Sequence, residues 1–246
     1  EGIAWGVVAG LAAVPLAQSG MTGALDLVDH KPFFDPDLIM AARTMPAICE
    51  TYTKFHAACR HVHAPVEAFS ALLKEYGLHP NDIEEVLVEA YSGALRIPNS
   101  TNPKNIVDAQ YSIPYCIGLV AIHGPESLLP MGPSSLGDTN AVSFASRVQI
   151  RVGAELEMRF PAETPVRVTI KTAKEVLVSA ITIPSGEASA RPSWNDRLRK
   201  FSIATAGSLS ITEQKLYQAT FEELAKGHLG ELLARKNIPF ARQPKL

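Results

Sequence analysis

The stretch Lys54-Phe-His-Ala-Ala-Cys-Arg-His-Val-His63 organises the rest of the sequence, and it leads directly into the apolar-periodic segment 64–73. It holds three of the seven histidines, together with a lysine, a cysteine and an arginine. In an extended chain His61 and His63 would face the same side. Pro65 suits the first turn of a following helix, where its missing N–H costs nothing. We therefore expect a strand or loop that presents polar side chains at a helix N-terminus, where anions are favoured.

The composition is ordinary for a globular protein, with 46% apolar and 20% charged residues among 246. A formal net charge of −2 argues against electrostatic binding of nucleic acid. The three cysteines, Cys49, Cys59 and Cys116, include no C-x-x-C pair, which excludes a disulfide framework or a zinc ribbon. Residues 56–63 read H-x-x-C-x-H-x-H, which could ligate zinc but is not a standard metal motif, so we expect no metal.

Hydrophobic periodicity and turn residues predict the secondary structure. The expected helices are 3–19, a short one at 21–25, 37–43, 64–76, 108–123, 138–146, 194–201, 212–226 and 229–236. The expected strands are 83–91, 148–152, 166–170 and 176–180. Helices followed by a β-rich middle and then helices again predict an α+β fold, in which a smaller α/β domain is inserted between parts of a mostly helical one. The predicted domains are 1–45, 46–188 and 189–246.

The N-terminal segment 2–17 is apolar, but it is too short and too interrupted by glycine for a membrane span. It also lacks the basic region of a signal peptide. The sequence enters a helical pattern at Glu1 without a capping residue, so we expect a fragment, a processed chain or half of a split polypeptide. We expect a cytoplasmic protein, or a mitochondrial one in a eukaryote, that binds no membrane.

Two segments contain residues that could carry chemistry. Lys54 is either a solvated surface lysine or, if desolvated, a group that binds a carboxylate or transfers a proton. In Asp108-Ala-Gln-Tyr-Ser-Ile-Pro-Tyr115, Tyr111 and Tyr115 are four residues apart on one face of the predicted helix, beside Ser112. The tyrosines are either packing residues or proton donors to a substrate oxygen.

Together these segments resemble the MmgE/PrpD family, which includes 2-methylcitrate dehydratase, cis-aconitate decarboxylase and iminodisuccinate epimerase. The similarity runs through the Gly/Ala-rich segment 10–23, the pattern Lys54-x-x-Ala-Ala-Cys-x-x-x-His63 with Val66-Glu-Ala68 after it, and the segment 108–115. The run 62–68, Val-His-x-Pro-Val-Glu-Ala, is similar to that of fungal cis-aconitate decarboxylases.

The resemblance implies a helical large domain with an α/β lid at residues 46–188, an active site between them, a homodimer, and no metal or organic cofactor. Lys54 and Tyr115 match the family's lid lysine and tyrosine, while Cys59 stands where some decarboxylases have histidine. A protonated His63 or His61 would hold a carboxylate beside Lys54. The candidate catalytic residues are therefore Lys54, Tyr115 and His63, the candidate substrate-binding residues are Cys59, Arg60, His61 and Ser112, and His56 is expected to have no role.

The expected activity is that of a cofactor-independent lyase on a small di- or tricarboxylate, namely 2-methylcitrate dehydration or cis-aconitate decarboxylation. Either reaction proceeds by proton transfer α to a carboxylate. One alternative is an epimerase of the same family. Another is a non-catalytic fragment or partner subunit that needs a separate N-terminal half, since the family's other site residues lie upstream of this sequence.

Overall fold

The structure, a computed structural model, describes residues 2–31, 33–41 and 50–228. These residues combine helices with a four-stranded sheet, which confirms the predicted α+β class. The chain divides into two compact units, residues 1–51 and 52–246. The predicted boundary at residue 46 lies outside the described residues, and the predicted boundary at residue 188 stays a prediction.

The first unit consists of helix α1 (Gly2–Gln18), a 3-10 turn (Leu27–Asp29) and helix α2 (Pro36–Ala41). The short helix expected at residues 21–25 is wrong, because Gly20 ends α1 in a left-handed conformation with a φ of 93° and the chain then turns. Apolar side chains of α1, among them Trp5, Leu11 and Val14, are exposed, and the homodimer and the separate N-terminal half stay predictions. None of the helices in the described ranges is long and apolar enough to cross a membrane.

Four strands of the second unit form one mixed sheet in the order β2-β1-β3-β4. Strand β1 pairs in parallel with β2 and antiparallel with β3, which pairs antiparallel with β4. The strands confirm the four that the sequence predicts, with bounds β1 (Ile83–Ala90), β2 (Val148–Val152), β3 (Arg167–Thr172) and β4 (Val176–Val178). In β1, Val86 and Val88 are fully buried while Leu87 and Glu89 are partly exposed, so one face of the sheet is apolar.

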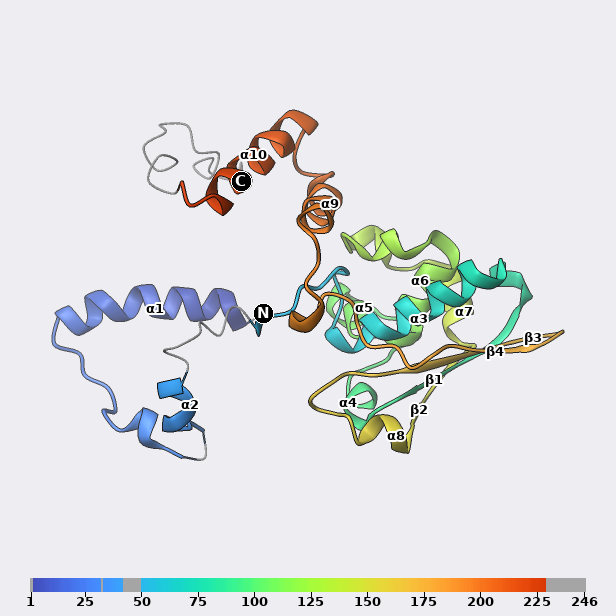
Figure 1. Cartoon of the computed structure of the whole chain (residues 1–246), viewed down its shortest axis with the longest axis horizontal. Coiled ribbons are helices and arrows are strands. Elements are labelled where there is room, and N and C mark those ends of the chain that lie inside the picture. Colours follow the sequence, from blue (N-terminus) through green and yellow to red (C-terminus); the bar gives the residue numbers. More distant parts are fainter. Residues whose placement is uncertain (1, 32, 42–49, 229–246) are drawn as a thin grey trace. The chain divides into compact units, whose positions relative to one another are not determined.

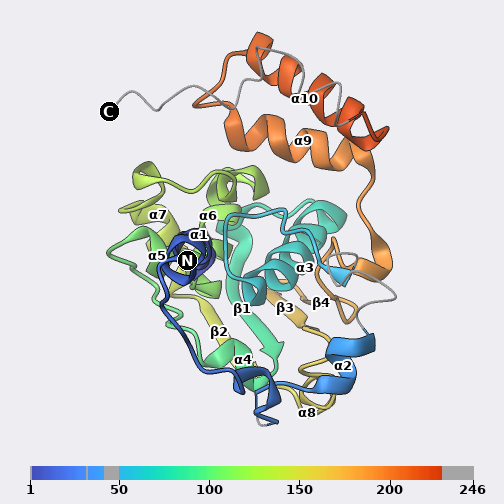
Figure 2. The same ribbon diagram turned by 90° about the vertical axis from the view of Figure 1, so that its left-hand side faces the viewer.

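Helices α3 (Arg60–Tyr76) and α6 (Ile113–His123) cover that apolar face and pack against each other (Figures 1 and 2). Helix α3 is amphipathic, and its buried residues recur at helical spacing and include Val62, Val66, Phe69 and Leu72. Helix α6 is apolar and buried along most of its length. Helix α7 (Thr139–Ala145), which Asp138 caps, packs on α6.

The sequence predicts one helix over residues 108–123, and most of these residues are helical, but the chain forms two helices there, α5 (Ile106–Gln110) and α6. Ser112 caps α6, since its Oγ accepts a hydrogen bond from the Tyr115 N–H at 3.1 Å, and Pro114 lies in the first turn. Tyr111 ends α5. Tyr111 and Tyr115 therefore do not share one helical face.

Helices α9 (Trp194–Thr205) and α10 (Ile211–Ala225) follow the sheet and confirm the helices predicted at 194–201 and 212–226. Each begins with a capping box, and Phe201 of α9 packs against two aromatic rings of α10. The helix predicted at 229–236 lies outside the described residues. The short elements of the unit are α4 (Ser92–Leu95), α8 (Ala154–Glu157) and 3-10 turns at Pro80–Asp82, Pro125–Leu128, Pro133–Ser135 and Ala188–Ala190.

Candidate functional site

The N-terminus of α3 holds most of the candidate residues, but not in the predicted conformation. The helix begins at Arg60 rather than at residue 64, with Cys59 as the N-cap residue, whose carbonyl accepts the Val62 N–H at 2.9 Å. His61 and His63 therefore lie within the first helical turn. Side chains two positions apart in an α-helix are separated by about 200° around the helix axis. The expectation that both histidines face the same side is wrong, and their rings lie in different surroundings.

His61 points toward the residue that follows strand β1. Its Nδ1 is 2.6 Å from the Tyr91 hydroxyl, and the Tyr91 ring stacks on Phe160 with a centroid distance of 4.5 Å. Burial lowers the pKa of His61 and raises the pKa of Tyr91. Both groups are therefore neutral at pH 7, and they form a neutral hydrogen-bonded pair.

His63 is fully buried, and its ring lies against that of His56 at a centroid distance of 5.1 Å. Burial lowers the pKa of His63 to about 3 and that of His56 to about 4. The expectation of a protonated His63 or His61 is therefore wrong, because desolvation disfavours the charged form of each imidazole. Neither ring nitrogen of His63 makes a well-formed hydrogen bond to a described residue, and the Ala58 carbonyl is a weakly placed neighbour.

Arg60 is committed to contacts within the protein. It forms an ion pair with Glu187, donates to the Ser185 carbonyl at 3.2 Å, and lies 4.3 Å from the centre of the Tyr52 ring. Ser185 in turn donates from its N–H and its hydroxyl to the carboxylate of Glu67, at 2.8 Å each. These contacts fasten the segment after β4 to the first turns of α3, and they balance the charge of Arg60.

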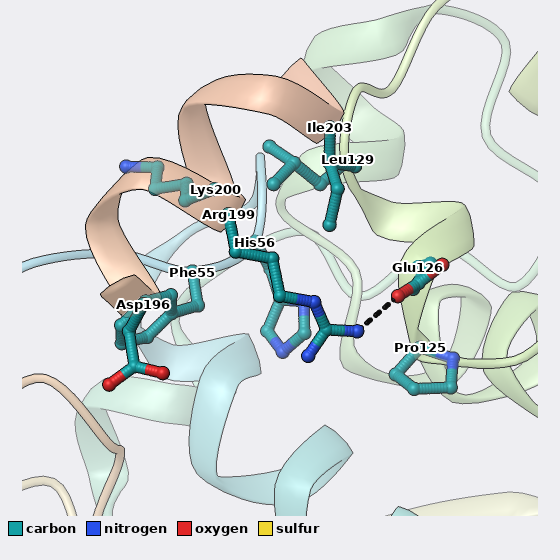
Figure 3. Close-up of a pocket in the computed structure, with 9 residues that line it drawn as sticks. All are labelled: Phe55, His56, Pro125, Glu126, Leu129, Asp196, Arg199, Lys200 and Ile203. Atoms are coloured by element: carbon teal, nitrogen blue, oxygen red, sulfur yellow. Dashed lines mark hydrogen bonds and ion pairs between the residues drawn. The ribbon is translucent and has the colours of Figure 1, made fainter. Parts of the chain in front are cut away.

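A pocket with a volume of about 250 Å³ lies beside the segment that precedes α3 (Figure 3). In Figure 3, Arg199 reaches Glu126, with which it forms an ion pair at 2.5 Å, while Lys200 extends in a different direction from the same helix, α9. Residues from three parts of the second unit line it: Phe55, His56, Pro125, Glu126, Leu129, Asp196, Arg199, Lys200 and Ile203.

Two lysines adjoin the pocket. Lys54 precedes the lining residues Phe55 and His56, is exposed, and donates from Nζ to the Ala58 carbonyl at 3.1 Å. Burial lowers the pKa of Lys200, and the positive charge of Lys54 lowers it further. Neither lysine forms an ion pair with a residue that the structure describes.

Three other candidates have structural contacts. The buried Tyr115 donates from its hydroxyl to the Ser135 carbonyl at 2.7 Å, and Ser112 donates to the Ser100 carbonyl at 2.6 Å besides capping α6. The backbone N–H of Cys59 donates to the Gln110 carbonyl at 2.8 Å. In the part of the chain that the structure describes, no hydrogen bond or ion pair joins Tyr115 to Lys54 or His63.

The profile of the MmgE/PrpD C-terminal domain matches residues 56–226, which is more than half of the sequence. The chain belongs to the MmgE/PrpD family. The predicted resemblance is thereby confirmed, and members of this family are generally dehydratases and other lyases. A comparison with curated protein sequences gives no significant match.

Several residues in and around the pocket were not expected from the sequence. Lys200 lies on α9, and no local pattern connects it to Lys54. Tyr91 directly follows the C-terminal end of a strand, which is a common place for a functional side chain in a sheet. Glu67 stands four residues after His63, a spacing that puts both on one helical face once the helix is known to begin at Arg60. His56, expected to have no role, lines the pocket.

Proposed function

We propose that this chain supplies the carboxylate-binding part of a lyase that acts on a small di- or tricarboxylate by proton transfer α to a carboxylate. Dehydration of 2-methylcitrate and decarboxylation of cis-aconitate are the two candidate reactions. Membership of the MmgE/PrpD family supports the reaction class. The observation that carries the substrate class is the pair Lys54 and Lys200 beside the pocket, without an ion-pair partner among the described residues.

Two neighbouring ammonium groups repel each other, and the partial burial of Lys200 removes water that would screen its charge. An anion that bridges the two lysines relieves both effects. Charge-assisted hydrogen bonds contribute about 1.5–3 kcal/mol each, so a substrate with two carboxylates gains more here than a monocarboxylate does. The same ammonium groups would stabilise the enolate-like charge that develops when the α-proton leaves.

The other charged residues near the pocket do not offer an equivalent anion site. Arg60 is paired with Glu187, and Arg199 is paired with Glu126. His56 is neutral because burial lowers its pKa to about 4, so at pH 7 it contributes a hydrogen bond rather than a charge. The lysine pair therefore accounts for the positive charge that would hold the substrate.

Isothermal titration of the full chain with 2-methylcitrate and with cis-aconitate tests the proposal. Loss of a charge-assisted contact in Lys54→Ala or Lys200→Ala should weaken binding about tenfold or more, since 1.4 kcal/mol is a factor of ten. Lys174→Ala is the matched control, because Lys174 is exposed in the turn between β3 and β4, and its affinity should not change. Absence of binding by the unmodified chain, or equal affinities in all three variants, would contradict the proposal; NMR analysis of products then identifies the reaction.

A further inference from the structure

His56, His63 and Glu67 form a cluster of metal-ligating side chains beside the pocket. One nitrogen or oxygen atom of each lies within 4.8 Å of those of the other two. His63 and Glu67 are four residues apart in α3, so they project from the same face of the helix one turn apart. His56 comes from the segment that precedes the helix. The cluster is therefore assembled from helix α3 and the segment that directly precedes it.

The His63 imidazole lacks the partner that a buried polar group requires. Its side chain is fully buried, and neither ring nitrogen makes a well-formed hydrogen bond to a described residue; the Ala58 carbonyl is a weakly placed neighbour. Buried polar side chains in folded proteins are nearly always satisfied by protein, water or an ion. A ligand atom of His56 and one of Glu67 lie within 4.8 Å of a His63 ring nitrogen and could share a bound ion with it.

The chemistry of the three donors suits a divalent transition metal. Two imidazoles and one carboxylate are ligands that Zn²⁺ accepts, with a fourth position left for water or a bound ligand. An imidazole binds such an ion through the lone pair of an unprotonated ring nitrogen, and one ring nitrogen of each histidine lies in the cluster.

The carboxylate of Glu67 is already oriented. Ser185 donates one hydrogen bond to each of its oxygens, at 2.8 Å, and each oxygen retains a further lone pair for a metal. Hydrogen bonds of this kind commonly fix ligating carboxylates in metal sites. Two cations oppose metal binding. Arg60 is offset by its ion pair with Glu187, whereas Lys54 has no such partner among the described residues.

We propose that His56, His63 and Glu67 form a binding site for a divalent transition-metal ion. The site goes beyond the proposed carboxylate-binding function, which uses Lys54 and Lys200 and requires no metal. Of its three protein ligands, His56 also lines the pocket, whereas His63 and Glu67 do not.

Metal titration of the full chain tests this site without reference to activity. After treatment with EDTA and its removal, the protein is titrated with Zn²⁺ against a chromophoric chelator, and with Co²⁺ while the visible absorption is recorded. We expect one equivalent of Zn²⁺ to bind and Co²⁺ to give the visible bands of a protein-bound ion. His63→Phe and Glu67→Gln should each weaken Zn²⁺ binding at least tenfold and reduce the Co²⁺ bands.

Two controls keep the result interpretable. His123→Gln changes an exposed histidine outside the cluster. Cys59→Ser removes the partly exposed thiol that lies between His56 and His63 in the sequence. Neither variant should alter the number of Zn²⁺ ions bound per chain. Circular dichroism checks that each variant is folded. If His63→Phe does not fold, Glu67→Gln alone carries the test. Failure of the unmodified chain to bind Zn²⁺, or binding that Glu67→Gln leaves unchanged, would overturn the proposal. Loss of Zn²⁺ binding in Cys59→Ser, with binding kept in His63→Phe and Glu67→Gln, would also overturn the proposal.

Discussion

The hydroxyl of Tyr115 offers the sharpest test of how the structure changes the interpretation of the sequence. Tyr115→Phe removes one oxygen atom and leaves the ring, which is fully buried against the core, in place. The lost group donates to the Ser135 carbonyl at 2.7 Å. Burial raises the pKa of this phenol, so at neutral pH it is a hydrogen-bond donor and does not lose its proton. We expect Tyr115→Phe to act on stability.

The size of the effect follows from this hydrogen bond. Removing a donor and leaving a buried acceptor unsatisfied costs about 1–3 kcal/mol. Ser135 is partly exposed, so water can reach its carbonyl in part, and we expect the lower half of that range, about 1–2 kcal/mol. For a chain of 150–250 residues, about 1 kcal/mol corresponds to roughly 2–4 °C in Tm, so the midpoint should fall by about 2–8 °C.

Urea unfolding at pH 7, followed by far-ultraviolet circular dichroism, measures the change. Tyr76→Phe is the matched control, because Tyr76 is 46% exposed at the end of α3 and its hydroxyl bonds to no described residue. Its free energy of unfolding should stay within about 0.5 kcal/mol of the unmodified value. A Tyr115→Phe protein as stable as the control, with severely reduced turnover of substrate, would refute the structural role and restore the catalytic role that the resemblance implies.

Two further predictions concern the pair beside His61 and the contact between α6 and α7. The pKa of Tyr91 is raised above 10.0, so above pH 10 the unfolded chain loses a proton that the folded chain keeps, and stability falls as the pH rises; at pH 11 this loss is about 1.4 kcal/mol. Guanidinium unfolding at pH 9 and pH 11 should show a fall in the free energy of unfolding that is larger by this amount in the unmodified chain than in Tyr91→Phe. Equal falls in the two proteins would contradict a raised pKa at Tyr91. Gly118→Ala should cost about 1–3 kcal/mol in thermal unfolding, because the added Cβ would lie 2.4 Å from the Ala141 carbonyl oxygen, whereas Gly132→Ala, with nothing within 4 Å, should be neutral; similar midpoints for the two variants would show that α7 can move away.

The sequence predicted the sheet well because strands report their burial locally. In β1, Val86 and Val88 alternate with polar or half-buried neighbours, which is the pattern expected of a sheet with one covered face. The N-cap of α7 at Asp138 was also predictable, since its side chain accepts from the N–H groups of residues 140 and 141. Both features depend on neighbours within a few residues.

The start of α3 could not be predicted in the same way. Cys59 is not a favourable capping residue, and its side chain makes no capping hydrogen bond. Its position is fixed instead by the hydrogen bond from its N–H to the Gln110 carbonyl, which lies far along the chain. Helix periodicity from residue 64 onward gave no sign that the helix extends back to Arg60. The error of one helical turn is what grouped His61 with His63.

The position of Lys54 couples the two proposed sites. Its positive charge lowers the pKa of His63 and that of Lys200, so it acts both on the proposed metal ligands and on the second lysine of the carboxylate site. A carboxylate bound to Lys54 would offset that charge and so reduce the repulsion against a cation at His63 and Glu67, to which Arg60 also contributes. Because linkage is reciprocal, a bound metal must then strengthen carboxylate binding by the same factor. A neutral side chain at position 54 therefore has opposite effects on the two ligands: it weakens carboxylate binding directly and favours the cation.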